Sequence, residues 1–208
     1  GLPRDIEELR RAAGDPDTWA QEYECVFLDQ ASREWLAWEE VLGALDAQML
    51  PDYAGAPCYV GMDIAARGDR TVIAVLEEAG QALALREMIV MRGESFAAQL
   101  AALDRVMREY RVARVAIDQT GMGEMPVEEA RRRHGAYSIE GVLFTPGRKL
   151  ELATALKDRM QARRLWLAVP DGERDEVIRD LRAVKMEPGA GGVPRLIAER
   201  DGSGHADR

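Results

Sequence analysis

The 208-residue chain has few thiol or imidazole side chains, with only two cysteines and two histidines. Cys25 and Cys58 form no CxxC pair and no zinc-ligand spacing, so we expect no disulfide framework and interpret both as buried thiols in a reducing cytosol. No apolar stretch approaches the roughly 20 residues of a membrane-spanning helix, and no signal peptide is recognised, so we expect no membrane span. Basic residues are also in deficit, since 28 Lys and Arg face 37 Asp and Glu for a net charge of −9. This balance is not what a simple nucleic-acid-binding protein shows, and it is compatible with a carboxylate metal site.

The composition predicts one globular domain with an appended N-terminal segment. The hydrophobic fraction of 47% is ordinary for a chain that buries a core. Residues 1–55 differ from the rest because they hold three of the four tryptophans, Trp19, Trp35 and Trp38. We expect a helical segment whose aromatic residues dock it onto a main domain at 56–208, with Pro51–Pro57 as a linker.

The main domain is predicted to open with an antiparallel three-strand meander. Cys58–Ile64, Thr71–Glu77 and Ala82–Val90 are apolar or β-branched runs separated by short turns. An amphipathic helix at Glu94–Tyr110 and a strand at Val112–Asp118 follow, and this crossover lets the fourth strand lie parallel beside the first. The remaining expected elements are helices at Glu124–His134, Lys149–Arg163 and Asp175–Val184, strands at Ile139–Phe144 and Leu165–Val169, and a hairpin of Val184–Glu187 with Arg195–Glu199. This order predicts an α/β, ribonuclease H-like mixed sheet flanked by helices.

Two aspartates end strands that are expected to be neighbours. Asp63 ends the first strand and Asp118 ends the fourth, so parallel pairing would bring two carboxylates together, which is costly unless something pairs with them. A third carboxylate would complete an oxygen-only site, and oxygen ligands select Mg²⁺ or Mn²⁺. Two such ions about 3.5–4 Å apart can activate water and stabilise the leaving oxygen of a phosphodiester. The pattern therefore predicts a metal-dependent nuclease.

The chain also resembles one family, the C-terminal nuclease domain of the tailed-bacteriophage terminase large subunit. Residues 19–25 are similar to the family's link from the motor domain. The ordered motifs that carry the resemblance are Gly61–Ala65, Gly68–Ile73, Val115–Asp118, Lys149–Leu152 and Gly204–Arg208.

The resemblance implies residue roles. Asp63, Asp118 and Asp207 match the family's three catalytic, metal-binding acids, and Asp69 matches an additional acid that helps to hold the second metal ion. The family continues beyond its third acid into a helix that packs on the sheet.

The resemblance also implies partners and a place of action. Such a domain cuts double-stranded, concatemeric viral DNA with little sequence preference, working with a terminase small subunit and a portal protein in the cytoplasm of the bacterial host. An ATPase domain belongs to the same full-length protein, yet no GxxxxGK[ST] motif occurs here, so we expect no ATP hydrolysis by this chain.

Several alternatives stay open at this point. Arg148 and Lys149 at a helix start are candidates for DNA phosphate contacts, since helix physics disfavours cations there. His205 could assist phosphate contact, although a structural hydrogen bond explains it somewhat better, and Asp69 and Asp118 could simply be turn residues. The competing functions are another ribonuclease H-like nuclease, such as a resolvase or transposase core, and a non-catalytic module that docks on the portal or DNA.

Overall fold

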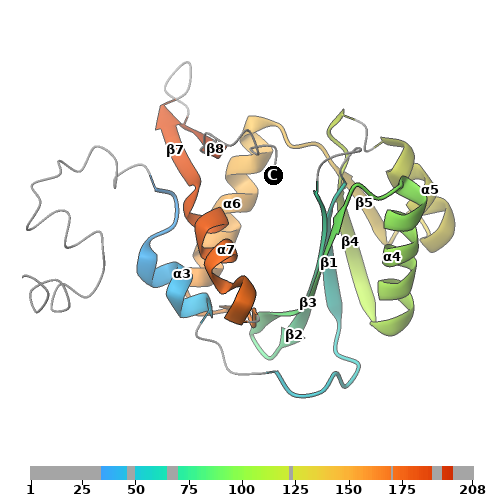
Figure 1. Cartoon of the computed structure of the whole chain (residues 1–208), viewed down its shortest axis with the longest axis horizontal. Coiled ribbons are helices and arrows are strands. Elements are labelled where there is room, and N and C mark those ends of the chain that lie inside the picture. Colours follow the sequence, from blue (N-terminus) through green and yellow to red (C-terminus); the bar gives the residue numbers. More distant parts are fainter. Residues whose placement is uncertain are drawn as a thin grey trace, which may run out of the picture.

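The computed structural model describes residues 34–45, 50–64, 70–121, 124–169, 171–188 and 194–198. A six-stranded mixed sheet forms its centre, with α4 and α5 on one side and α3, α6 and α7 on the other (Figure 1). The sheet strands are β1 (Cys58–Asp63), β2 (Arg70–Ala79), β3 (Ala82–Arg92), β4 (Val112–Asp118), β5 (Ile139–Val142) and β6 (Leu165–Trp166). The helices are α3 (Trp38–Leu45), α4 (Phe96–Glu109), α5 (Glu124–His134), α6 (Pro146–Gln161) and α7 (Asp171–Arg182). None of these described helices is both long enough and apolar enough to cross a membrane.

The strand order is β5-β4-β1-β2-β3-β6. β1, β2 and β3 pair antiparallel, whereas β4 pairs parallel with β1, β5 parallel with β4, and β6 parallel with β3. The expected meander with added parallel strands is therefore confirmed. A separate antiparallel pair, β7 (Val184–Pro188) and β8 (Pro194–Ala198), confirms the expected hairpin.

The main core lies between the sheet and helices α4 and α5. Alternate residues of β1 are buried, as a half-buried strand requires. Among the helix residues packed against them, Leu103 and Val127 are fully buried. A side-chain cluster joins the two helices at their outer surface, because Asp104 of α4 contacts both Arg133 and His134 of α5 at 2.7 Å. Asp104 thus balances part of the positive charge at the end of α5.

The segment around α3 docks on the other side of the sheet, as the sequence predicted for Trp35 and Trp38. The indole N–H of Trp35 donates to the carbonyl of Ala153 at 3.2 Å, and Lys157 Nζ lies 5.1 Å from the centre of the Trp35 ring. The guanidinium of Arg182 lies 4.9 Å from the centre of the Trp38 ring. A second buried cluster holds this layer together, formed by Leu36, Val41, Ala44, Leu45, Met160 and Leu165. Trp19 lies outside the described residues.

Some predicted boundaries were wrong. α6 begins at Pro146, three residues before the predicted Lys149. Thr145 is its N-cap, accepting from the backbone N–H of Arg148 at 3.3 Å, and proline is favoured in the first helical turn. α7 begins at Asp171 instead of Asp175, and β5 ends at Val142. Because α6 begins at Pro146, Arg148 and Lys149 lie in the first turn of this helix, close to the carboxyl end of β5.

Candidate active site

The two strand-end aspartates lie at the same level on neighbouring strands. Met62 of β1 is the register partner of Ile117 in β4, and Asp63 and Asp118 are the next residue on each strand. On the far side of β4, Asp118 pairs with Val142, the last residue of β5. Three parallel strands therefore end together at this edge of the sheet, and two of them end in a carboxylate.

Both carboxylates lie on the face of the sheet that points away from the main core. In β1 the residues Cys58, Val60 and Met62 are buried, whereas the alternate residues Tyr59, Gly61 and Asp63 are exposed. Burial against the core raises the pKa of the Cys58 thiol above its usual value, in line with a buried, unreactive cysteine. Asp63, on the other face, is exposed at the end of a central strand.

A tight turn holds Asp118. Its Oδ1 accepts the backbone N–H of Thr120 at 2.7 Å, and the hydroxyl of Thr120 accepts the backbone N–H of Phe144 at 3.0 Å. The backbone N–H of Gln119 donates to the carbonyl of Val142 at 2.9 Å. The loops after β4 and β5 are thereby joined beside the carboxylate. The expected role of Asp118 in capping a turn is therefore confirmed for Oδ1. The second carboxylate oxygen can bind another group, such as a cation.

The two basic candidates at the start of α6 differ in their surroundings. Arg148 donates to Glu151 Oε1 at 2.8 Å and lies 3.7 Å from Glu140 on β5. The hydrogen bond to Glu151 raises the pKa of Arg148. Lys149 is exposed on the surface of the helix. Arg148 is thus already balanced by carboxylates, a relation that sequence reasoning missed because Glu140 belongs to a separate strand.

Sequence reasoning also did not predict an ion pair at the same end of the sheet. Arg70 opens β2 two residues before Val72, the register partner of Asp63. Its guanidinium pairs with Glu176 of α7. This contact fixes α7 to the sheet near the aspartates, and no spacing in the sequence signals it because 106 positions separate the partners.

The remaining predicted site residues, Asp69, Asp207 and His205, lie outside the described residues. Within the described ranges, no group of three His, Cys, Asp or Glu side chains could hold a metal ion. The pair that is described nevertheless fits a hard cation, because Asp63 and Asp118 offer carboxylate oxygens from the ends of adjacent strands.

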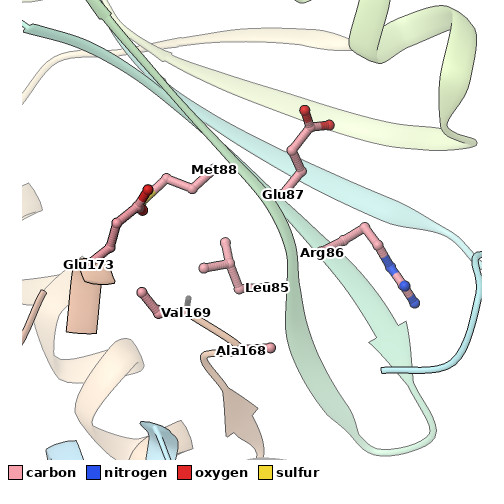
Figure 2. Close-up of a pocket in the computed structure, with 7 residues that line it drawn as sticks. All are labelled: Leu85, Arg86, Glu87, Met88, Ala168, Val169 and Glu173. Carbon is pink, nitrogen blue, oxygen red and sulfur yellow. The ribbon is translucent and has the colours of Figure 1, made fainter. Parts of the chain in front are cut away.

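A pocket of about 240 Å³ lies away from these aspartates, between β3 and the segment that leads into α7. Figure 2 shows Leu85, Ala168 and Val169 facing its interior, whereas Arg86 and Glu87 extend to the other side of β3. Glu77 of β2 pairs with the Arg86 guanidinium there. The pocket is small, and neither of the two described candidate acids, Asp63 and Asp118, lines it.

Comparison with known protein families gives one match. Residues 60–208 match the family described as "Terminase RNaseH-like domain". No curated protein matches the chain.

Solved structures show the same fold. The large terminase nuclease from thermophilic phage G20c with bound magnesium has 18% sequence identity and a TM-score of 0.63, over 82% of this chain and 90% of that chain. A variant nuclease domain of the large terminase subunit gp2 of bacterial virus Sf6, with manganese and beta-thujaplicinol, has 13% identity and a TM-score of 0.58, over 79% and 87%. The HK97 bacteriophage large terminase has 11% identity and a TM-score of 0.60, and the match covers 93% of this chain but only 46% of that one. At such low identities it is the structural similarity, with TM-scores of 0.58 to 0.63, that shows a shared fold.

Proposed function

The chain belongs to the terminase RNaseH-like domain family, and we propose that it is a metal-dependent endonuclease that cuts concatemeric viral DNA during genome packaging. One observation carries the proposal: Asp63 and Asp118 end adjacent parallel strands at one level of the sheet. Two carboxylates in that arrangement offer the oxygen ligands that Mg²⁺ and Mn²⁺ prefer. The G20c and Sf6 nuclease structures hold magnesium and manganese, respectively, which supports the same ions here.

Asp63, Asp118 and Asp207 would hold two ions, with Asp69 as an additional ligand of the second. When bound, such ions lower the pKa of water and stabilise the leaving oxygen of a phosphodiester. The chain's own contribution is to hold carboxylates at a defined separation. Asp118 is held by the hydrogen bond that its Oδ1 accepts from the Thr120 N–H, and its second carboxylate oxygen would be the metal ligand.

DNA contacts are proposed for the start of α6 and for His205. Lys149 is exposed on α6, which follows β5 directly, so it can meet a phosphate near the aspartates. Arg148 is paired with Glu151 and Glu140, so its role is better described as fixing the helix start beside β5. A phosphate could still draw Arg148 away from these carboxylates at some cost.

The packaging machinery supplies the proposed partners. These are double-stranded DNA, a terminase small subunit, a portal protein and the ATPase domain of the same full-length protein, all in the cytoplasm of the bacterial host. The match to the HK97 large terminase covers less than half of that chain, which supports the idea that this unit works beside a further domain. We place the link to that domain in residues 1–55 and the nuclease in 56–208.

The test is plasmid cleavage by this chain in Mn²⁺, in Mg²⁺ and in EDTA. The proposal expects nicked and linear products in at least one metal and none in EDTA. Cleavage that persists in EDTA would overturn the metal dependence. Absence of cleavage in every condition, repeated with a chain extended past Arg208 and joined to its ATPase domain, would favour the non-catalytic docking module.

A further inference from the structure

Neither backbone conformation nor any contact in the described part of the chain requires a glycine at position 61. It lies in the middle of β1, two residues before Asp63 on the same face of the sheet. Its φ is not in the positive region, and a Cβ added there would meet no described atom within 4 Å. Glycine inside a strand is destabilising relative to alanine and commonly marks a place where a ligand or another backbone approaches closely.

The residues beside Gly61 on the two adjacent strands also have small side chains. Its register partners are Ala74 on β2 and Ala116 on β4. This row of small residues lies directly beside the row that contains Asp63 and Asp118. On its other side lies the row of Tyr59, whose side chain is 37% exposed, and Arg114, its register partner on β4.

The dimensions of this strip follow from strand geometry. Tyr59 and Asp63 are four residues apart on one strand, which places their Cα atoms roughly 13 Å apart with Gly61 midway. Gly61 is itself exposed, although β1 is hydrogen-bonded on both sides. A central strand is therefore open to solvent on one face beside the candidate acids.

We propose that Gly61 is a substrate-positioning residue: the absence of a side chain lets the sugar–phosphate backbone of the DNA strand to be cut lie directly on β1 beside Asp63. The inference rests on the proposed nuclease function and names how that site admits its substrate. A side chain at position 61 would hold the strand away from the carboxylates, and a displacement of about 1 Å can lower a rate on the order of 100-fold.

The experiment is a size series at this position, Gly61→Ala, Gly61→Val and Gly61→Leu. Because a Cβ meets no described atom, these variants should fold, and Gly61→Val should be at least as stable to thermal unfolding as the original chain. Ala113→Val is the matched control, because Ala113 is an exposed residue on β4 at the end of the strand remote from Asp118. Three quantities are measured: plasmid cleavage in Mn²⁺, affinity for a short DNA duplex in Ca²⁺, and Mn²⁺ binding by calorimetry.

The expected result is that cleavage and DNA affinity fall progressively with side-chain size, by about 100-fold in cleavage for Gly61→Leu, while Mn²⁺ affinity and the Ala113→Val control are unchanged. Unchanged DNA affinity across the series would overturn the inference. Loss of Mn²⁺ binding in Gly61→Val would also overturn it, since the space would then belong to the metal ligands and not to DNA. If the original chain binds DNA but cuts none, the nuclease proposal fails while the affinity series still decides the role of Gly61. If it binds no DNA, the inference is overturned.

Discussion

Asp118 and Thr120 form a closed turn at the end of β4: the Thr120 N–H donates to Asp118 Oδ1 at 2.7 Å. The Thr120 hydroxyl then accepts the backbone N–H of Phe144 at 3.0 Å. One residue thus connects the carboxylate to the segment that leads into α6. This relationship makes Thr120 a positioning residue for the proposed site.

Thr120→Val should impair cleavage because it removes the hydroxyl that accepts from Phe144 while keeping the shape of the side chain. The expected loss is about 10-fold in the cleavage rate, as for residues that orient a metal ligand. Thr120→Ser restores the acceptor and should recover most of the rate. A valine variant as active as the serine variant would show that the hydroxyl plays no part in positioning Asp118.

Lys149 and Arg148 should differ in their effect on DNA binding. Lys149→Ala removes an exposed cation, so the duplex affinity should fall and the slope of log affinity against log salt should decrease by about 1. Arg148→Ala should change that slope less, because Arg148 is already paired with Glu151. Measuring affinity across a salt series checks both variants, and equal slopes for both would contradict this distinction.

Glu129 should titrate at unusually low pH. Hydrogen bonds from Arg132, the larger contributor, and from Arg133 lower the pKa of Glu129 from 4.5 to about 2. A lowered folded-state pKa means that this contribution to stability is present above pH 4.5 and is lost as the pH falls towards 2. Carbon-detected NMR of the carboxyl group should give the low midpoint, and Arg132→Gln should raise it. Because Glu129 and its two arginine partners lie at the surface, high salt should weaken this lowering of the pKa. A midpoint near 4.5 in the original chain would refute the contacts.

Leu103 should be far more important to stability than Leu152. Leu103 of α4 is 0% exposed, whereas Leu152 of α6 is 37% exposed. Leu103→Ala should lower the free energy of unfolding by about 2–5 kcal/mol, because it removes buried methyl groups and leaves a cavity. Leu152→Ala should change it by about 0.5 kcal/mol or less. Urea unfolding followed by circular dichroism measures both, and similar losses would contradict the described core.

Strands and helices with local sequence signals could be predicted. Val112–Asp118 and Glu124–His134 begin and end where apolar periodicity changes, and both match the structure. The start of α6 was missed because Pro146 and Gly147 suggest a loop, although Thr145 caps the helix and proline suits its first turn.

The surroundings of the candidate site were less accessible to sequence reasoning. The position of Asp63 and Asp118 at the ends of adjacent strands followed from the predicted topology, because both residues end parallel neighbours. The contacts of Arg148 with Glu140 and of Arg70 with Glu176 join separate elements, and only the folded chain brings them together. The open space at Gly61 depends on which face of β1 is covered, a property of packing that a strand pattern does not contain.

The most direct measurement is plasmid cleavage in Mn²⁺ by Asp118→Asn beside the original chain. Asparagine keeps a carbonyl oxygen that can accept the Thr120 N–H, so the turn and the fold should survive. Replacing the charged carboxylate should nevertheless abolish cleavage, because a neutral amide is a poor ligand for a hard cation. Loss of cleavage in a variant with unchanged thermal unfolding is the predicted result. Full activity in that folded variant would contradict the assignment of the active site to the ends of β1 and β4.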